Sequence, residues 1–187
     1  RTAAEALVTS QDVGFFSFIG SAQVGWSLRS KLAPGTRCAL EHGGVAPVII
    51  AADANIQEIV PILGKGGFYH AGQVCVSVQR IFAHNDIARQ VGEELAKFAK
   101  SLVVGDPTDP ETDVGPLIRP GDVDRVHDWV QEALEGGGEL LTGGDKLSES
   151  CYAPTVLFNP PEHALVSTKE VFGPVICVYS FNDIDGA

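Results

Sequence analysis

The sequence predicts an α/β fold with a mostly parallel sheet flanked by helices. Apolar runs of strand length alternate with segments of helical period along all 187 residues. Glycine and proline clusters separate these segments, as expected for turns between regular elements. Apolar residues make up 44% of the chain and charged residues 20%, which is typical of a globular protein.

In the first part of the chain, strands and helices are expected to alternate. Strands are predicted over 13–18, 36–41, 47–51 and 79–84 because these runs are apolar or β-rich. The helical period of Val24, Leu28 and Leu32 predicts a helix over 22–32 that Pro34-Gly35 ends. A second helix over 54–69 is expected to be capped by Asp53 or Asn55. A third runs to about residue 102, capped by Asn85 or Asp86.

The second part begins with a loop over 105–121 that is rich in Pro, Gly and Asp and has no periodicity. A helix over 122–134 follows, and the triplet Gly136 to Gly138 is expected to end it. The remaining strands are predicted over 139–142, 153–158 and 175–181. The glycine pair after Glu41 marks the expected domain boundary, near 41–44.

The charge and the residue usage exclude several classes of function. Thirteen basic residues face twenty-four acidic ones, for a net charge of −11, and no basic cluster favours nucleic acid or an anionic membrane as partner. The longest apolar run, 45–52, is far shorter than a membrane span, and the start of the chain lacks a signal-peptide pattern. We therefore expect a cytoplasmic protein.

Cysteine and histidine spacing argues against disulfides and metals. The four cysteines show no CxxC spacing and are expected to be free thiols, three of them small core residues. The five histidines show no HxxxH or HxH spacing, so no metal site is expected. No GxSxG motif indicates a serine hydrolase.

The turn at Gly20-Ser21 links a predicted strand to a predicted helix. Backbone N–H groups at such a helix start can bind a phosphate, although a serine there is more often a simple N-cap. The sequence contains no GxGxxG fingerprint to decide between the two.

Two further residues are candidates for covalent catalysis. Cys75 lies in a loop of small residues after Gly72, where a thiolate nucleophile would be approachable, although most free cysteines are buried and inert. Glu41 ends a strand before Gly43-Gly44 and would suit a general base, although an exposed glutamate is commoner.

Glu170 and Phe172 stand two residues apart before a Gly-Pro break. Such a pair would hydrogen-bond a ribose and pack on a planar ring, or would simply form a turn before the last strand. Their spacing alone leaves both interpretations open.

Taken together, four runs resemble motifs of the aldehyde dehydrogenase superfamily, in order and across the whole chain. They are Phe18-Ile19-Gly20-Ser21, Leu40-Glu41-His42-Gly43-Gly44, Gly72-Gln73-Val74-Cys75 and Glu170-Val171-Phe172-Gly173-Pro174. The family's usual residues differ at Ile19, His42 and Val45, none of which is a catalytic position.

The resemblance implies a role for each matched residue. Cys75 would attack the aldehyde to give a thiohemiacetal and then a thioester, and Glu41 would activate the water that hydrolyses it. The cofactor would be NAD or NADP. Gly20, Ser21 and Gly25 would contact its pyrophosphate, Glu170 its ribose, and Phe172 would lie near the nicotinamide.

The resemblance also implies that the chain is part of a longer protein. Residues 1–42 would be the C-terminal part of a Rossmann-like NAD(P)-binding domain, and 43–187 a catalytic domain truncated at its C-terminus. The family's Asn-Pro-Trp type motif does not occur. The full-length protein would be a homo-oligomer, a dimer or tetramer, acting on a small aldehyde. Alternatives are a CoA-acylating relative, or a piece that is inactive by itself and serves as a structural module.

Overall fold

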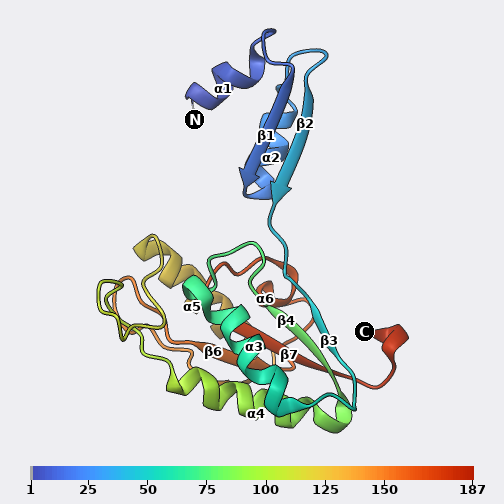
Figure 1. Ribbon diagram of the computed structural model, residues 1–187, viewed down its shortest axis with the longest axis vertical. Coiled ribbons are helices and arrows are strands. Elements are labelled where there is room, and N and C mark those ends of the chain that lie inside the picture. The colour runs from blue at the N-terminus through green and yellow to red at the C-terminus, as the bar shows by residue number, and fades with distance from the viewer. Residues whose placement is uncertain (1) are drawn as a thin grey trace. The chain divides into compact units, whose positions relative to one another are not determined.

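The computed structural model describes residues 2–187, with side chains described from residue 3 onward. The chain divides into two compact units, one up to Gly44 and one over Val45–Ala187. Each unit has its own sheet, and each is described by itself (Figure 1).

The first unit is built around two parallel strands. In chain order it contains α1 (Thr2–Thr9), β1 (Phe15–Gly20), α2 (Ala22–Arg29) and β2 (Arg37–His42). The strands pair in register from Phe15 opposite Arg37 to Gly20 opposite His42, with α2 as the crossover. Val8, Phe16 and Ala33 form the buried apolar centre of this unit.

The second unit holds a five-stranded sheet in the order β3-β4-β7-β6-β5. All neighbours are parallel except β5 and β6. The last strand in the chain, β7, is therefore the central one. The strands are β3 (Val48–Ile50), β4 (Arg80–His84), β5 (Glu139–Thr142), β6 (Thr155–Phe158) and β7 (Val175–Phe181).

Helices cover both faces of this sheet. Gly67 of α3 approaches the side chain of Ile176, and Gly92 of α4 approaches Phe158, so these two helices share one face. On the other face α6 bonds to β7 through the hydroxyls of Ser167 and Tyr179, 2.6 Å apart. The helices are α3 (Ile56–Phe68), α4 (Asn85–Ser101), α5 (Pro120–Glu135) and α6 (Leu165–Thr168), with short 3₁₀ turns η1 (Tyr69–Gly72) and η2 (Ile184–Gly186).

The predicted fold class is confirmed, and most element boundaries differ by one or two residues. Asn55 caps α3 as expected, its side chain accepting a hydrogen bond from the Gln57 N–H. The expected cap of α4 is wrong: His84 is the N-cap, and its Nδ1 accepts from the Asp86 N–H. The helix α1 was not predicted, since the short run 2–9 lacks a cap signal.

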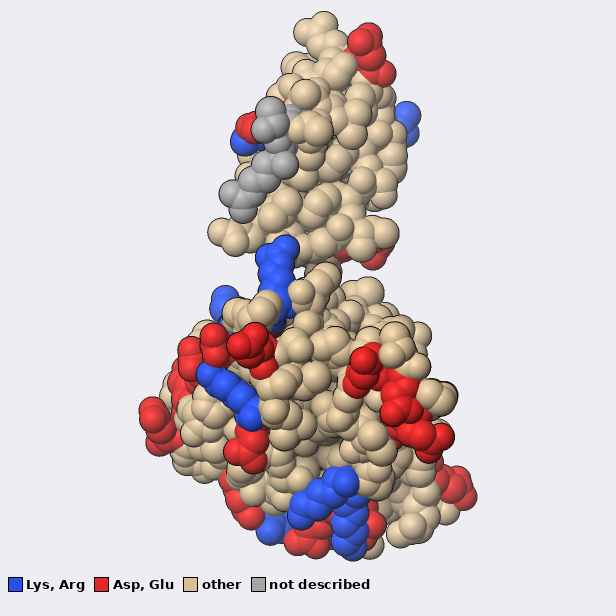
Figure 2. Space-filling model, turned by 90° about the vertical axis from the view of Figure 1, so that its left-hand side faces the viewer, with Lys and Arg blue, Asp and Glu red and all other residues tan. Residues whose placement is uncertain are grey.

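The surface carries both signs of charge. On the face shown in Figure 2, Lys and Arg side chains of the second unit are interspersed with Asp and Glu. Arg89 illustrates this, since its guanidinium contacts Glu93 at 2.8 Å and Glu139 at 2.6 Å. Over residues 2–187, no helix combines the length and apolar character needed to cross a membrane.

Candidate active site

The parallel pair of the first unit brings three of the predicted site residues to one edge. Gly20 lies opposite His42, and Ile19 lies opposite Glu41. Since parallel strands end at the same edge, Ser21, just after β1, and Glu41, near the end of β2, both lie at this edge. The Glu41 side chain is exposed. The Gly20-Ser21 turn and Glu41 are thus neighbours here.

The ring of Phe18 explains why both glycines of this turn are needed. A β-carbon at Gly20 would lie 2.7 Å from the ring atom Cζ of Phe18. At Gly25 it would lie 3.1 Å from Cδ1 of the same ring. Without side chains, the strand end and the first turn of α2 pack closely around the ring.

Ser21 stands at the N-cap of α2 without acting as a side-chain cap. Its backbone is extended, with φ −65° and ψ 144°, and its hydroxyl makes no capping hydrogen bond. The N–H groups of the first helical turn therefore keep their capacity to bind an anion, which the helix dipole favours. Of the two interpretations of this turn, side-chain capping is the one the structure does not show.

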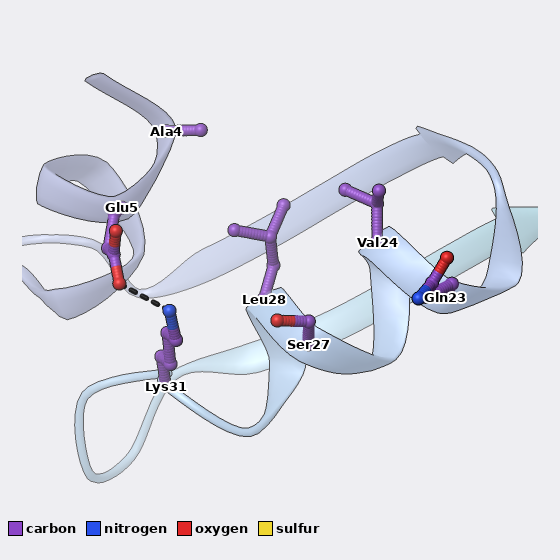
Figure 3. Close-up of a pocket in the computed structure, with 7 residues that line it drawn as sticks. All are labelled: Ala4, Glu5, Gln23, Val24, Ser27, Leu28 and Lys31. Atoms are coloured by element: carbon purple, nitrogen blue, oxygen red, sulfur yellow. Dashed lines mark hydrogen bonds and ion pairs between the residues drawn. The ribbon is translucent and has the colours of Figure 1, made fainter. Parts of the chain in front are cut away.

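A groove of about 440 Å³ lies between α1 and α2, within the first unit (Figure 3). Its walls combine apolar and polar side chains, namely Ala4, Glu5, Gln23, Val24, Ser27, Leu28 and Lys31. Lys31 and Glu5 form an ion pair at one end, and the hydrogen bond from Lys31 lowers the pKa of the Glu5 carboxyl. The groove is not predicted from the sequence because α1 is not, although the run Ala3-Ala4-Glu5-Ala6-Leu7 is rich in helix-forming residues.

In the second unit, Cys75 follows a tight turn at the end of α3. His70, Ala71 and Gly72 all have positive φ, at 49°, 56° and 70°. Cys75 is the exposed cysteine, whereas Cys177 is buried and the other two are half-buried. Among residues 2–187, no backbone hydrogen bond uses the N–H of Cys75. Thiol and N–H are therefore both available to a ligand.

Gly72 brings the cysteine loop against the segment that contains Glu170 and Phe172. A β-carbon at Gly72 would lie 2.0 Å from the carbonyl oxygen of Gly173 and 3.2 Å from the nitrogen of Pro174. The two backbones are thus in direct contact. The third and fourth sequence motifs, about a hundred residues apart in the chain, form one structure.

Gln73 joins the cysteine loop to a second segment, residues 116–118, a role that is not predicted from the sequence. Its Nε2 donates to the carbonyl oxygen of Pro116 at 3.2 Å, and its Oε1 accepts from the N–H of Ile118 at 3.0 Å. These bonds join the cysteine loop to the irregular segment before α5. The run Gly115-Pro116-Leu117-Ile118 shows no periodicity, so the sequence gives little indication of its contact with Gln73.

Phe172 is held in an unusual conformation. Its φ is +48°, and 41% of its side chain is exposed. Such a backbone is disfavoured for an aromatic residue and persists only when its surroundings impose it. The neighbouring Glu170 is half-buried. The structure thus presents an aromatic ring and a carboxylate from one short segment beside the cysteine loop.

The thiol of Cys177 is buried in the core of the second unit. Burial raises the pKa of the Cys177 thiol to about 12, so this thiol stays protonated and unreactive at neutral pH. Within residues 2–187, no group of three or more His, Cys, Asp or Glu side chains could hold a metal ion. Of the four thiols, the one classed as exposed is that of Cys75.

Comparison with known proteins gives one consistent result. The model of the aldehyde dehydrogenase family matches residues 1–187. A 3-sulfolactaldehyde dehydrogenase from Priestia aryabhattai is 39% identical over 181 residues, which cover 97% of this chain and 38% of that protein. A benzaldehyde dehydrogenase [NAD(+)] from Pseudomonas putida is 37% identical over 184 residues, covering 98% of this chain and 38% of that protein.

A solved structure agrees. The glyceraldehyde-3-phosphate dehydrogenase of Methanocaldococcus jannaschii, determined with NADP, superposes with a TM-score of 0.90 at 38% identity. The match covers 96% of this chain and 39% of that one. The chain thus spans under two fifths of the length of the proteins it resembles.

Proposed function

This chain belongs to the aldehyde dehydrogenase family, and from that premise we propose that the whole protein oxidises an aldehyde to a carboxylic acid with NAD or NADP. The observation that carries the proposal is the contact between Gly72 and Gly173, which joins the Cys75 loop to the Glu170–Phe172 segment. A nucleophile beside a carboxylate and an exposed ring is the combination that such chemistry needs.

Cys75 is the proposed nucleophile. Its sulfur would bond to the aldehyde carbon, and the resulting oxyanion would accept a hydrogen bond from the unused N–H of Cys75. One such donor is worth about 3–4 kcal/mol of barrier in other enzymes. The thiol gives up its proton on attack, loss of hydride from the same carbon leaves a thioester on Cys75, and the sulfur regains a proton when water displaces it.

Glu41 is the proposed base for that water. Its carboxylate is exposed at the end of β2 and would take a proton from water as the water attacks the thioester carbon. The products are the free acid and the Cys75 thiol. Presence of this carboxylate favours hydrolysis over transfer of the acyl group to coenzyme A.

The first unit fits a dinucleotide. The groove between α1 and α2 has the volume of a small-molecule site, with apolar walls at Val24 and Leu28 for a planar ring. Gly20, Ser21 and Gly25 would leave the backbone approachable for the pyrophosphate at the start of α2. Bound cofactor would supply the hydride acceptor. Glu170 would hold the nicotinamide ribose and Phe172 would lie near the nicotinamide.

We accordingly assign residues 1–42 to the end of a cofactor domain and 43–187 to most of a catalytic domain. A β-α-β unit with a phosphate-type turn supports the first assignment, and a separate sheet with its own core supports the second.

The test is to incubate the full-length protein with NAD⁺ or NADP⁺ and a set of aldehydes, including sulfonated and aromatic ones, and to follow reduced nicotinamide. We expect reduced cofactor and free acid in equal amounts. Formation of acyl-CoA in the presence of coenzyme A would instead support the acyl-transfer alternative. A folded protein that binds the cofactor and reduces none of it would overturn the proposal.

A further inference from the structure

Gln79 stands at the end of the cysteine loop, directly before β4, and its side chain is buried with 5% of its surface exposed. Its backbone is anchored on both sides. The carbonyl oxygen accepts from the N–H of Cys177 at 2.8 Å, and its N–H donates to the carbonyl of Val45 at 3.3 Å. The residue is thus a fixed point four positions after Cys75.

The amide of Gln79 binds the segment before Phe172 at three places. Its Nε2 donates to the carbonyl oxygens of Val166 at 2.9 Å and Lys169 at 2.7 Å. Its Oε1 accepts from the N–H of Val171 at 2.8 Å. Both amide hydrogens and the amide oxygen are used, so the side chain has little capacity left for a ligand.

Arg125 of α5 binds the carbonyl group of Val171, whose N–H is bound by Gln79. Its Nη1 donates to the carbonyl oxygen of Val171 at 2.7 Å. The guanidinium is itself fixed, since it lies 4.9 Å from the centre of the Trp129 ring and 3.4 Å from the carboxylate of Asp122. Both polar groups of Val171 are therefore bound by side chains from two other elements.

We call the bonds from Gln79 and Arg125 to Val171 the clamp. Its position in the chain indicates a role beyond packing. Glu170 and Phe172 flank the clamped residue, and Phe172 has its φ of +48° immediately after it. On the far side, Gly173 is packed on Gly72. Glu170 lies between the bonded residues Lys169 and Val171, and Phe172 lies between Val171 and Gly173, so the backbone of both is held relative to the cysteine loop.

We propose that Gln79 and Arg125 are positioning residues, which set the Glu170 carboxylate and the Phe172 ring against the Cys75 loop for binding of the nicotinamide half of the cofactor. The inference rests on the proposed function. It adds that cofactor affinity depends on two side chains that do not touch the cofactor.

The test uses Gln79→Met and Arg125→Leu in the full-length protein. Met keeps the length of Gln79 but makes none of its bonds. Asn159→Gly is the control for loss of an amide, because Asn159 also bonds a backbone N–H, that of Ser180 at 2.8 Å, away from this segment, and glycine tolerates its φ of +46°. Arg89→Leu is the control for loss of a guanidinium. It removes the Arg89 side chain from α4, together with its two ion pairs.

Three readouts separate positioning from stability. Without cofactor, hydrogen exchange at the amides of 170–173 should quicken about tenfold in both clamp variants and in neither control. Alkylation of Cys75 by iodoacetamide should stay within about twofold of the original rate. The Kd for NAD⁺ or NADP⁺ and its KM should rise about tenfold, each more than kcat falls.

Unchanged exchange and unchanged cofactor affinity in a folded Gln79→Met protein would overturn the proposal, as would equal losses in the controls. If Gln79→Met does not fold, Arg125→Leu, on a partly exposed helix, decides by the same readouts. Failure of the proposed function looks different: the unsubstituted protein would then bind no cofactor, while the exchange measurement would still report on the clamp.

Discussion

The backbone of Gly72 contacts the backbone of Gly173 so closely that a β-carbon on Gly72 would lie 2.6 Å from the Gly173 carbonyl carbon. No flexible side chain is available to move aside, because both surfaces are main chain. The contact fixes the cysteine loop relative to the segment carrying Glu170 and Phe172. The effect of this contact on stability can be tested without an assay of activity.

Gly72→Ala should destabilise the protein by at least about 3 kcal/mol, from the backbone clash together with the strained positive φ. Gly137→Ala is the matched control, with φ +101° and open space around it, and should cost only about 1 kcal/mol. Urea unfolding of both variants measures the difference. Equal costs would show that the two backbones can separate without penalty.

Cys75→Ala should lower aldehyde oxidation in the full-length protein by at least about 10⁴-fold, because the covalent intermediate cannot form. Cofactor affinity should be unaffected, since the thiol is not part of the proposed cofactor contacts. Steady-state kinetics and a binding titration check the two halves of this prediction. Cys151→Ala removes a half-buried thiol and should leave the rate unchanged. Substantial activity in Cys75→Ala would remove the thiol from the mechanism.

Glu41→Gln should retain a first rapid turnover of hydride transfer and then slow the steady state by about 10²-fold or more, because the amide cannot take the proton from water. Rapid mixing with one equivalent of cofactor resolves the burst. Glu111→Gln, at another exposed glutamate, serves as control. Loss of the burst itself would assign Glu41 to an earlier step.

Val24→Asp should raise the Kd for the cofactor about tenfold, because a charge would replace an apolar wall of the groove between α1 and α2. Val103→Asp makes the same change at another half-exposed valine and should have no such effect. Fluorescence titration of the full-length protein with NAD⁺ or NADP⁺ provides the measurement. Identical cofactor affinities of the two variants would show that the planar ring of the cofactor binds outside this groove.

Cys177 should make stability fall at alkaline pH. Burial raises the pKa of its thiol to about 12 from an ordinary value of 9.0, so the folded chain holds a proton that the unfolded chain releases first. The unfolded state therefore binds fewer protons above pH 9, and the free energy of unfolding declines as pH rises through this window. Urea titrations at several pH values test this. Cys177→Ala should flatten the decline, and an unchanged slope would contradict the assignment.

Much of the fold could be predicted because short runs rich in apolar residues are separated by glycine and proline. The strands 139–142 and 175–181 were placed at the observed residues, since Gly and Pro bound them clearly. The order of the strands could not be found this way. No pattern in the sequence says that the last strand lies between the second and fourth of its sheet.

The site residues illustrate the same limit. Cys75 and the Glu170–Phe172 segment were singled out by local sequence, yet their association depends on a backbone contact between Gly72 and Gly173. The amide bonds of Gln79 and Gln73 likewise join distant segments, and neither glutamine differs locally from any other polar loop residue. The cap of α4 was predicted wrongly for a related reason. Asn85 and Asp86 are the better-known cap formers, but the His84 ring is placed so that its Nδ1 accepts the hydrogen bond from the Asp86 N–H.

The central place of β7 has a consequence for biosynthesis. A ribosome that adds about 5–20 residues per second needs roughly 5–20 s to travel from the cysteine loop to the strand that completes the sheet. During that interval β4 has no partner on its inner side, and Cys75 lacks the segment that later shelters its loop. The nascent chain therefore passes through a period in which its most accessible thiol and an open strand edge are presented together, and in which oxidants and chaperones have their best opportunity to act on it.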